Sequence, residues 1–496
     1  MPETLSIALS TSLPEAAQAI VLYADDKGSL GPVAAEIWQR TGLDFERIAK
    51  ATGFAGRPGH MIDIPVPTGL TADRLLVLGR GTDGEGDSEA AWRDRGGSLF
   101  ARLAAADVSD VAVILDEPGL TPRLVAALAA GARLRSYRFD KHLKRRKKPE
   151  DTGKQATLVI GALKGVEDAL ADALAVADGT ILARDLVNEP ANLLGPEDIA
   201  NAALKLADIG VEVEILDEAE MEKLGMGALL AVGQGSRRPS RLAVMQWNGG
   251  AKGQQPVAFV GKGIVFDTGG ISIKPAANME NMKGDMAGAA AVLGLMQALA
   301  TRKANVNAIG ILALAENMPD GNAFRPGDVV TAMSGETIEI ISTDAEGRLV
   351  LADALWYCQQ RFSPKAMFNI ATLTGAIIVA LGNDHAGLFT NTEALAAKFA
   401  EAGRLTGEKV WHMPMGPAYD KLIESRFADI KNSGGRSGGS ITAAQFLSHF
   451  VNDVPWAHLD IAGTGFGGAS SETNASWGTG FGVALFDRLV RDNYES

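Results

Sequence analysis

Short apolar segments alternate with helix-like stretches over roughly the first 160 residues. The apolar segments are 17–22, 74–78, 111–115 and 157–160, and each has the length of a buried strand. Because strands that alternate with helices are typical of α/β folds, we expect an N-terminal α/β domain at residues 1–160.

A longer stretch, residues 165–186, is rich in Ala, Leu and Asp at helical spacing. It predicts a helix that connects the first domain to a second one, which starts near Pro190 and Pro196. The expected division is therefore 1–160 for the N-terminal domain, 161–187 for the connecting helix and 188–496 for the larger domain.

The apolar segment 256–260 predicts a buried strand that ends at Gly261, Lys262 and Gly263, which would place Lys262 at its carboxyl end. The following loop, 266–270, closes with two glycines, as expected where the backbone turns tightly and approaches a ligand. Asp285 is expected to open an Ala-rich helix that continues to about residue 300. Since open parallel sheets bind ligands at the carboxyl ends of their strands, these segments are expected to converge there.

A second acidic segment contains Asp344 and Glu346. In extended backbone the two carboxylates would point to one side of the chain. An isolated acidic turn of this kind is usually a solvated surface feature. Here the segment lies in an apolar, glycine-rich context, where charged residues need a physical reason.

Electrostatics supplies that reason if the acidic residues converge. At contact distance and an effective dielectric of about 20, each pair among Asp267, Asp285, Asp344 and Glu346 would repel by roughly 4 kcal/mol. Two divalent cations would balance the four negative charges. Lys274 and Arg348 would then remain as positive charges, placed to meet an oxyanion or a bound anion. The pattern therefore indicates a two-metal hydrolase.

Composition agrees with a globular enzyme. The 496 residues are long enough for two or more domains, and the net charge of -13 argues against a nucleic-acid-binding surface over the whole protein. The basic run 141–148 could contact nucleic acid, but such runs are more typical of solvated loops. The single cysteine, Cys358, excludes intramolecular disulfides and suits a reducing compartment. Together with the lack of a visible secretory signal or membrane-spanning run, this predicts a cytoplasmic protein that does not engage membranes.

Two other hydrolase classes find no support in the sequence. The six histidines lack the H-E-x-x-H spacing of thermolysin-type zinc sites. Among the expected strand-to-helix turns, no G-x-S-x-G elbow of a serine hydrolase is evident. Metal ions are therefore the expected activators of water.

The spacing of these residues resembles that of the leucyl (cytosol) aminopeptidase family. Lys262, Asp267, Lys274 and Asp285 are separated by four, six and ten residues, and Asp344 to Leu349 follow downstream. The resemblance begins near 188–192, continues through 372–375 and 458–463, and covers the last three fifths of the chain. Ser342 and Gly284 depart from the commonest family pattern, the first by replacing an asparagine and the second by replacing a larger residue.

The resemblance implies a two-metal site with manganese or zinc. Lys262, Asp267, Asp285 and Glu346 would bind one ion, and Asp267, Asp344 and Glu346 would bind the other. Lysine coordinates only as the neutral amine, so metal binding should weaken in acid. The family also implies that Lys274 polarises the scissile carbonyl and that Arg348 holds a bicarbonate acting as general base.

The resemblance further implies a catalytic domain with a central, mostly parallel sheet flanked by helices, peptide substrates and a homohexamer. The residues that would form the substrate pocket carry no charge: Met282, Thr372, Gly375, Ala462 and Gly465. We therefore expect a metal-dependent aminopeptidase that prefers N-terminal leucine and other apolar residues. Two alternatives remain open, a two-metal phosphoesterase and a DNA-binding or regulatory scaffold.

Overall fold

The computed structural model describes residues 5–81, 88–105, 107–117, 119–144, 155–161 and 163–495. Residues 145–148 of the basic run lie outside these ranges. The chain forms two compact units, Met1–Ala177 with Ser470–Ser476 and Asp178–Ala469 with Trp477–Ser496. Both are α/β structures, which confirms the predicted class of a smaller N-terminal and a larger C-terminal domain.

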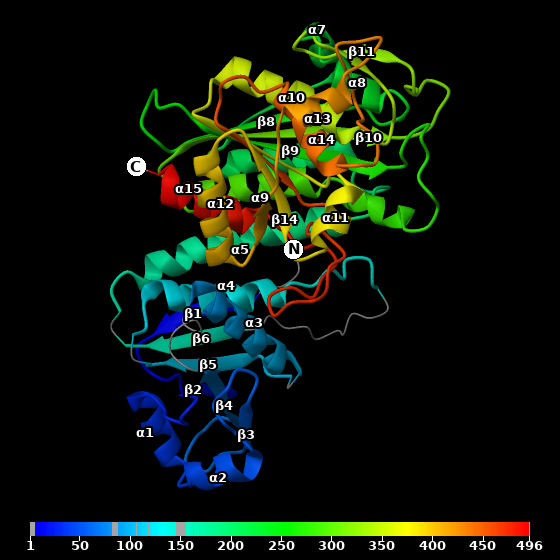
Figure 1. Cartoon of the computed structure of the whole chain (residues 1–496). Coiled ribbons are helices and arrows are strands. Elements are labelled where there is room, and N and C mark those ends of the chain that lie inside the picture. Colours follow the sequence, from blue (N-terminus) through cyan, green and yellow to red (C-terminus); the bar gives the residue numbers. More distant parts are fainter. Residues whose placement is uncertain are drawn as a thin grey trace. The chain divides into compact units, whose positions relative to one another are not determined.

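The smaller unit contains a six-stranded sheet in the order β1-β6-β5-β2-β4-β3, parallel except for β3 (Figure 1). Its strands are β1 (Ser6–Ser10), β2 (Ala19–Asp25), β3 (Met61–Pro65), β4 (Arg74–Gly81), β5 (Asp110–Leu115) and β6 (Gln155–Ile160). Its helices are α1 (Pro32–Arg40), α2 (Phe45–Thr52), α3 (Glu89–Ala105) and α4 (Pro122–Ser136). Two apolar clusters cover its two faces, with Val21 in one and Leu22 in the other. The four predicted strands are confirmed, whereas the edge strands β1 and β3, which are only partly buried, were not predicted.

Helix α5 (Val166–Asn188) covers the segment predicted to be helical, and the division between the units falls within it. No helix in the described part of the chain is long and apolar enough to cross a membrane.

The larger unit is built on an eight-stranded sheet in the order β15-β14-β17-β13-β9-β10-β8-β7. Its four central strands are parallel to one another, while β7, β8 and the β14/β17 pair add antiparallel pairings. The strands are β7 (Glu212–Leu216), β8 (Arg241–Asn248), β9 (Val257–Asp267), β10 (Asn307–Asn317), β13 (Ala366–Ala371), β14 (Ala386–Thr390), β15 (Val410–His412) and β17 (Trp456–Asp460). A small sheet joins β11 (Val329–Thr331), β12 (Thr337–Glu339) and β16 (Ile430–Lys431).

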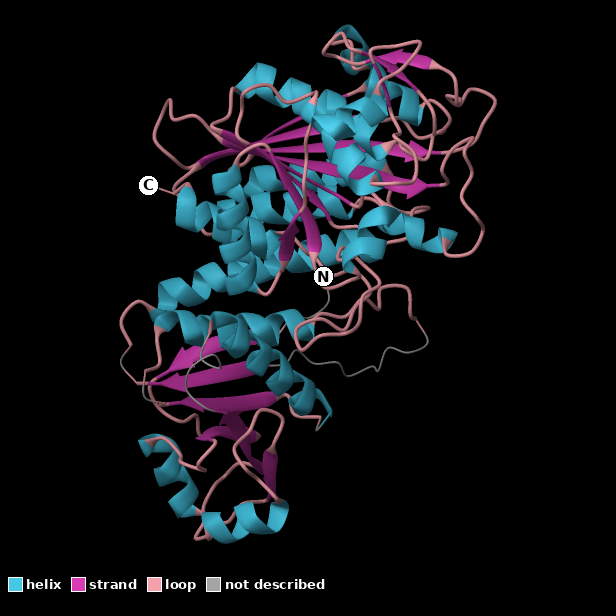
Figure 2. Ribbon diagram, viewed as in Figure 1, coloured by secondary structure: helices cyan, strands magenta, loops and turns pink. Residues whose placement is uncertain are grey.

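Helices pack on both faces of the large sheet (Figure 2). One face is covered by α8, α10 and α14, whose apolar residues share a core with Val260 and Trp456. The other face contacts α9 and α15, where Phe486 packs on Phe259. Cys358 is buried within α10. The helices of this unit are α6 (Pro196–Leu204), η2 (Lys205–Ile209), α7 (Glu218–Lys223), α8 (Gly227–Gly233), η3 (Met279–Gly284), α9 (Ala287–Thr301), α10 (Gly347–Phe362), α11 (Gly375–Leu381), α12 (Glu393–Thr406), α13 (Pro417–Ile423), α14 (Gly439–Ser448) and α15 (Val483–Asn493).

The predicted strand end at Gly261–Gly263 is wrong, because β9 continues to Asp267 and contains Lys262 in its middle. The two glycines serve close packing instead of a turn. A Cβ at Gly261 would lie 2.6 Å from the Cα of Ala289 in α9, and one at Gly263 would lie 2.5 Å from the Cδ2 of Leu314. Glycine therefore allows α9 and β10 to pack tightly against the strand that carries the site.

Candidate metal centre and active site

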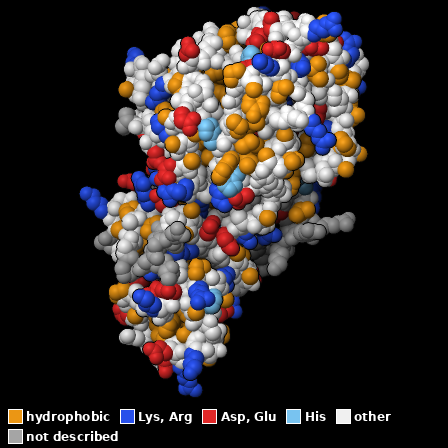
Figure 3. All heavy atoms as spheres, viewed as in Figure 1, with side chains coloured by type: hydrophobic (Ala, Val, Ile, Leu, Met, Phe, Trp, Pro, Cys, Tyr) orange, Lys and Arg blue, Asp and Glu red, His pale blue; other side chains and the backbone are white. Residues whose placement is uncertain are grey.

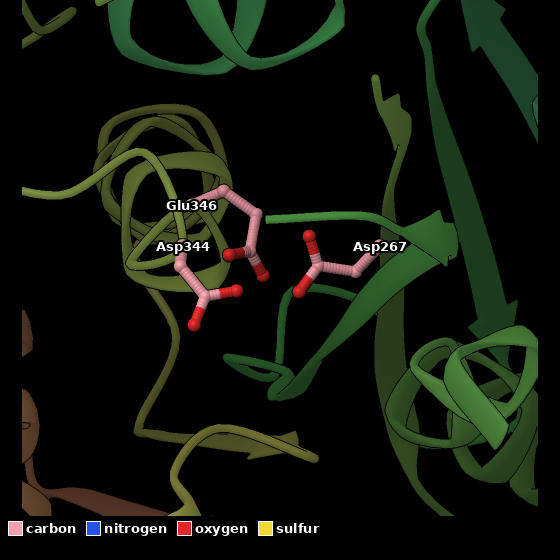
Figure 4. Close-up of side chains that lie close together, drawn as sticks. All are labelled: Asp267, Asp344 and Glu346. Carbon is pink, nitrogen blue, oxygen red and sulfur yellow. The ribbon is translucent and has the colours of Figure 1, made fainter. Parts of the chain in front are cut away.

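Three carboxylates meet where β9 ends and α10 begins. Asp267 is the last residue of β9, and Asp344 and Glu346 immediately precede α10. One oxygen from each of the three lies within 4.8 Å of the others. Figure 4 shows their carboxylate groups turned toward one another. The predicted convergence is therefore present for three of the four carboxylates, and Asp285 is not in this group.

The backbone that achieves this convergence differs from the prediction. Residues 343–344 form a turn, in which the backbone N–H of Ala345 donates to the carbonyl of Ser342 at 3.2 Å. Glu346 has helical backbone angles (φ -80°, ψ -36°) at the N-terminus of α10. The expectation of extended backbone is wrong, and the two side chains converge because the turn folds directly into the helix.

Contrary to the prediction from the sequence, Asp285 does not open the Ala-rich helix. It follows η3 as the C-cap residue, and α9 begins two residues later, at Ala287. The methionine between them, Met286, adopts a nonhelical N-cap conformation, so the helix does not start at the aspartate. The carboxylate of Asp285 nevertheless belongs to the same site, because it pairs with Lys262.

Lys262 is buried, with 2% of its surface exposed, and its ammonium group joins two of the carboxylates. Its Nζ lies 2.8 Å from Oδ2 of Asp285 and 2.9 Å from Oε1 of Glu346, and it donates to the carbonyl of Thr372 at 2.9 Å. Burial alone would lower the pKa of Lys262, but the surrounding carboxylates raise it. The surrounding carboxylates therefore favour the charged form of Lys262.

Lys274 neutralises the opposite side of the cluster. Its Nζ lies 2.7 Å from Oδ2 of Asp267 and 2.5 Å from Oδ1 of Asp344. Gly269 and Gly270 both have positive φ angles, as predicted for a tight turn, and a Cβ at Gly269 would lie 3.0 Å from Oδ1 of Asp344. Their close approach to a ligand stays a prediction.

Negative charge nevertheless exceeds positive charge, since four carboxylates face two lysines. Burial, together with the charges of Glu346 and Asp267, raises the pKa of Asp285 to about 8. Burial also raises the pKa of Asp344. One buried oxygen, Oε2 of Glu346, has no hydrogen-bond partner. A carboxylate-rich site with an unsatisfied buried oxygen fits divalent cations such as Mn²⁺ or Zn²⁺.

Arg348 lies one residue beyond the N-terminus of α10 and is buried. Its Nη1 donates to the carbonyl of Asn432 at 2.8 Å, while its Nε is buried without a hydrogen-bond partner. Burial lowers the pKa of Arg348 to about 10. Among the described residues it forms no ion pair with a carboxylate, so its charge remains available to an anion.

The predicted pocket residues come from four different segments. Met282 belongs to η3, Thr372 follows β13, Gly375 begins α11, and Ala462 and Gly465 follow β17. Direct proximity is clear for one pair, since a Cβ at Gly465 would lie 3.2 Å from Cγ2 of Thr372. Thr372 also contacts one of the clustered acidic side chains, because its Oγ1 donates to Oδ1 of Asp285 at 2.8 Å. At Gly375 a Cβ would meet no atom within 4 Å, so open space lies there.

Three buried residues that the sequence reasoning did not select hold these segments in place. Asn317, at the end of β10, donates to Oδ1 of Asp267 at 2.8 Å and to the carbonyl of Thr343 at 3.0 Å. Asp460, at the end of β17, accepts from Oγ1 of Thr374 at 2.6 Å and from the backbone N–H of Ala462 at 3.2 Å.

The third is Asn432, which donates to the carbonyl of Ser342 at 2.7 Å and accepts from the backbone N–H of Ile341 at 2.8 Å. Ser342, where the chain departs from the commonest family pattern, is thus held through its backbone. Asn317 and Asp460 end strands of the large sheet, and polar residues at the carboxyl ends of parallel strands were the available sequence signal.

Comparison with known protein families agrees with this geometry. The model of the cytosol aminopeptidase family catalytic domain matches residues 181–486, and the model of that family's N-terminal domain matches residues 20–147. This chain belongs to the cytosol aminopeptidase family. A probable cytosol aminopeptidase of Bradyrhizobium sp. strain BTAi1 is 56% identical over 481 residues, 96% of each chain. Another from Chelativorans sp. strain BNC1 is 55% identical over the full length of both.

Solved structures share the whole fold of this aminopeptidase. A mutant of tomato leucine aminopeptidase superposes with a TM-score of 0.86 at 32% identity, covering 99% of this chain and 97% of the other. The bottromycin maturation enzyme BotP, solved in complex with Mn, has a TM-score of 0.84 at 33% identity. The match covers 96% of this chain and 99% of BotP. The chain is therefore a metal-dependent peptidase, as the sequence predicted.

Proposed function

We propose that this aminopeptidase removes leucine and other apolar residues from the N-termini of peptides. The observation that carries the proposal is the direct link between the uncharged pocket and the carboxylate cluster, through the hydrogen bond of Thr372 to Asp285. Open space at Gly375 leaves room for a branched side chain. An acidic side chain would lose its hydration in such a pocket without finding a partner.

The residues fit two divalent ions, manganese or zinc. Lys262, Asp267, Asp285 and Glu346 would hold one ion, and Asp267, Asp344 and Glu346 would hold the other, so Asp267 and Glu346 would serve both. When bound, such ions supply Lewis-acid activation of water and anchor the substrate amine. Lys262 would have to release the proton that its neighbours now stabilise.

Lys274 and Arg348 carry the remaining chemistry in this proposal. Lys274 is paired with Asp267 and Asp344, and cations on those carboxylates would free its ammonium to polarise the scissile carbonyl. Arg348 would hold a bicarbonate that accepts the proton from water. Its buried guanidinium, with no carboxylate partner among the described residues, supports that role.

We also propose a cytoplasmic homohexamer. Monomeric proteins rarely expose large contiguous apolar patches, and such patches usually mark interfaces. Figure 3 shows apolar side chains gathered on one face of the larger unit. That unit exposes 91% of Val379, 71% of Phe427 and 59% of Trp411. The number of subunits rests on the family resemblance.

Hydrolysis of a panel of aminoacyl anilides tests the proposal, measured before metal chelation, after it and after metal restoration. Leucyl substrates should exceed glutamyl ones in kcat/KM by at least ~10-fold, a difference of about 1.4 kcal/mol in transition-state binding. Equal or reversed preference would refute the pocket assignment. Phosphate-ester turnover would favour the phosphoesterase alternative, and salt-sensitive duplex binding would favour the scaffold.

A further inference from the structure

A cleft of about 610 Å³ lies in the larger unit beside η3, on residues to which the proposed reaction gives no role. It is lined by the segment 190–192 together with Phe266, Glu280, Asn281, Lys283 and Trp477. Its volume falls within the range of small-molecule sites.

The cleft and the predicted substrate pocket use different faces of the same short helix. In a 3₁₀ helix, residues three apart lie one above the other. Glu280 and Lys283 therefore share one face of η3, while Met279 and Met282 share another. Asp285, a predicted metal ligand, follows this helix directly as its C-cap residue. A molecule in the cleft would thus press on the segment that positions both Met282 and Asp285.

One wall of the cleft is aromatic and is fitted closely to η3. Trp477 stacks on Phe466 with ring centroids 4.7 Å apart. A Cβ at Gly284 would lie 2.5 Å from Cδ1 of Phe466 and 2.8 Å from Cη2 of Trp477. The glycine that departs from the commonest family pattern is therefore what allows the aromatic pair to pack against η3.

Opposite charges border this wall. The Nζ of Lys283 lies 4.9 Å from the Trp477 ring centroid and donates to the carbonyl of Asn188 at 2.7 Å. An ammonium group has three donors, so two remain. Lys283 and Glu280 both line the cleft, and within the described ranges no ion pair joins them. The side-chain amides of Asn192 and Asn281 add further donors and acceptors.

A separated cation and anion beside an aromatic wall match the chemistry of an apolar amino acid. We propose that this cleft is a second binding site for a free apolar amino acid such as leucine. Lys283 binds its carboxylate, Glu280 its ammonium group, and Trp477 and Phe266 contact its side chain. The choice of ligand rests on the proposed function, because that reaction releases such an amino acid.

The test is titration of L-leucine into the metal-loaded, full-length protein, followed by calorimetry and tryptophan fluorescence. Leucine hydroxamate at saturating concentration blocks the active site, and it lacks the carboxylate that Lys283 would bind. We expect one further leucine per chain. Lys283→Met and Glu280→Gln should each weaken this binding at least 10-fold, and N-acetyl-leucine, which lacks the ammonium group, should bind correspondingly less tightly.

Lys252→Met is the matched control, because Lys252 is an exposed lysine in a turn of the same unit. It should bind leucine as the unaltered protein does. Circular dichroism checks that each variant is folded. If Lys283→Met does not fold, Glu280→Gln, which alters an exposed side chain, serves as the test of the binding site. Absence of leucine binding to the blocked protein, or equal binding by the unaltered protein and Glu280→Gln, would overturn the inference. A protein that binds leucine in this way but hydrolyses no peptide would refute the proposed function and leave the cleft assignment standing.

Discussion

Gly347→Ala should damage the active site far more than it damages the fold. A Cβ at this position would lie 2.5 Å from Cε and 2.7 Å from Nζ of Lys262. The lysine cannot easily move aside, because it is buried and its ammonium is held by Asp285, Glu346 and the carbonyl of Thr372. The new methyl group must therefore displace either the lysine or the start of α10, which carries Glu346.

The expected loss of activity is much larger than the expected loss of folding stability. Overpacking a buried site costs about 1 to 3 kcal/mol of folding stability. Replacing a helical glycine by alanine returns up to about 1 kcal/mol, so the net loss is small. A displacement of about 1 Å in a catalytic group can lower the rate by ~100-fold. We therefore expect kcat/KM for leucyl anilide to fall by about that factor, with a modest decrease in melting temperature.

Metal content measured by mass spectrometry, anilide hydrolysis and thermal unfolding form the assay. Gly321→Ala is the control, because a Cβ at Gly321, in the same unit, would meet no atom within 4 Å. It should behave as the unaltered protein does. Full activity and full metal content in Gly347→Ala would show that the contact between α10 and Lys262 does not position the site.

Three further predictions concern single side chains. Lys274→Ala should leave metal content nearly intact and lower kcat by at least ~100-fold, as for loss of one oxyanion-stabilising donor; full activity would contradict its role. Glu346→Gln should lose metal and activity together, and a metal-replete inactive variant would argue against ligation. Burial raises the pKa of Asp353 to about 7, so its protonation favours the folded state at low pH and this contribution is lost as pH rises from about 4 to 7. Urea unfolding at pH 5 and 7 should show Asp353→Asn gaining stability relative to the unaltered protein by up to about 1.4 kcal/mol per pH unit, and a constant difference would refute this.

The sequence was sufficient to predict the α/β class, the strands at the centre of the smaller sheet and the convergence of Asp267, Asp344 and Glu346. The class and the strands depend on continuous apolar segments, and the convergence depends on acidic residues that require compensating positive charges. Both patterns are visible in the sequence. The site assignments beyond this convergence, including the ligand roles of Lys262 and Asp285, remain predictions.

Local backbone conformation was harder to predict. Gly261 and Gly263 indicated a turn, but they lie within β9 and give room to neighbouring elements. Asp344 and Glu346 were expected in extended backbone, but a turn leads directly into α10. For the two glycines the deciding contacts are with α9 and β10, which are distant in the chain, so the local pattern could not distinguish packing from turning.

The buried polar residues that the sequence pattern did not indicate have one physical role in common. Asn317, Asn432 and Asp460 are fully buried, and each joins backbone or side chains of segments that are far apart in the sequence. Their partners are mostly backbone amides and carbonyls, which have no sequence signature. The charged motif therefore indicates which reaction the site can support, while the polar residues behind it fix the geometry on which the rate depends. Because that geometry arises from contacts between distant segments, the reaction class can be inferred from the motif, whereas rate and specificity require the fold.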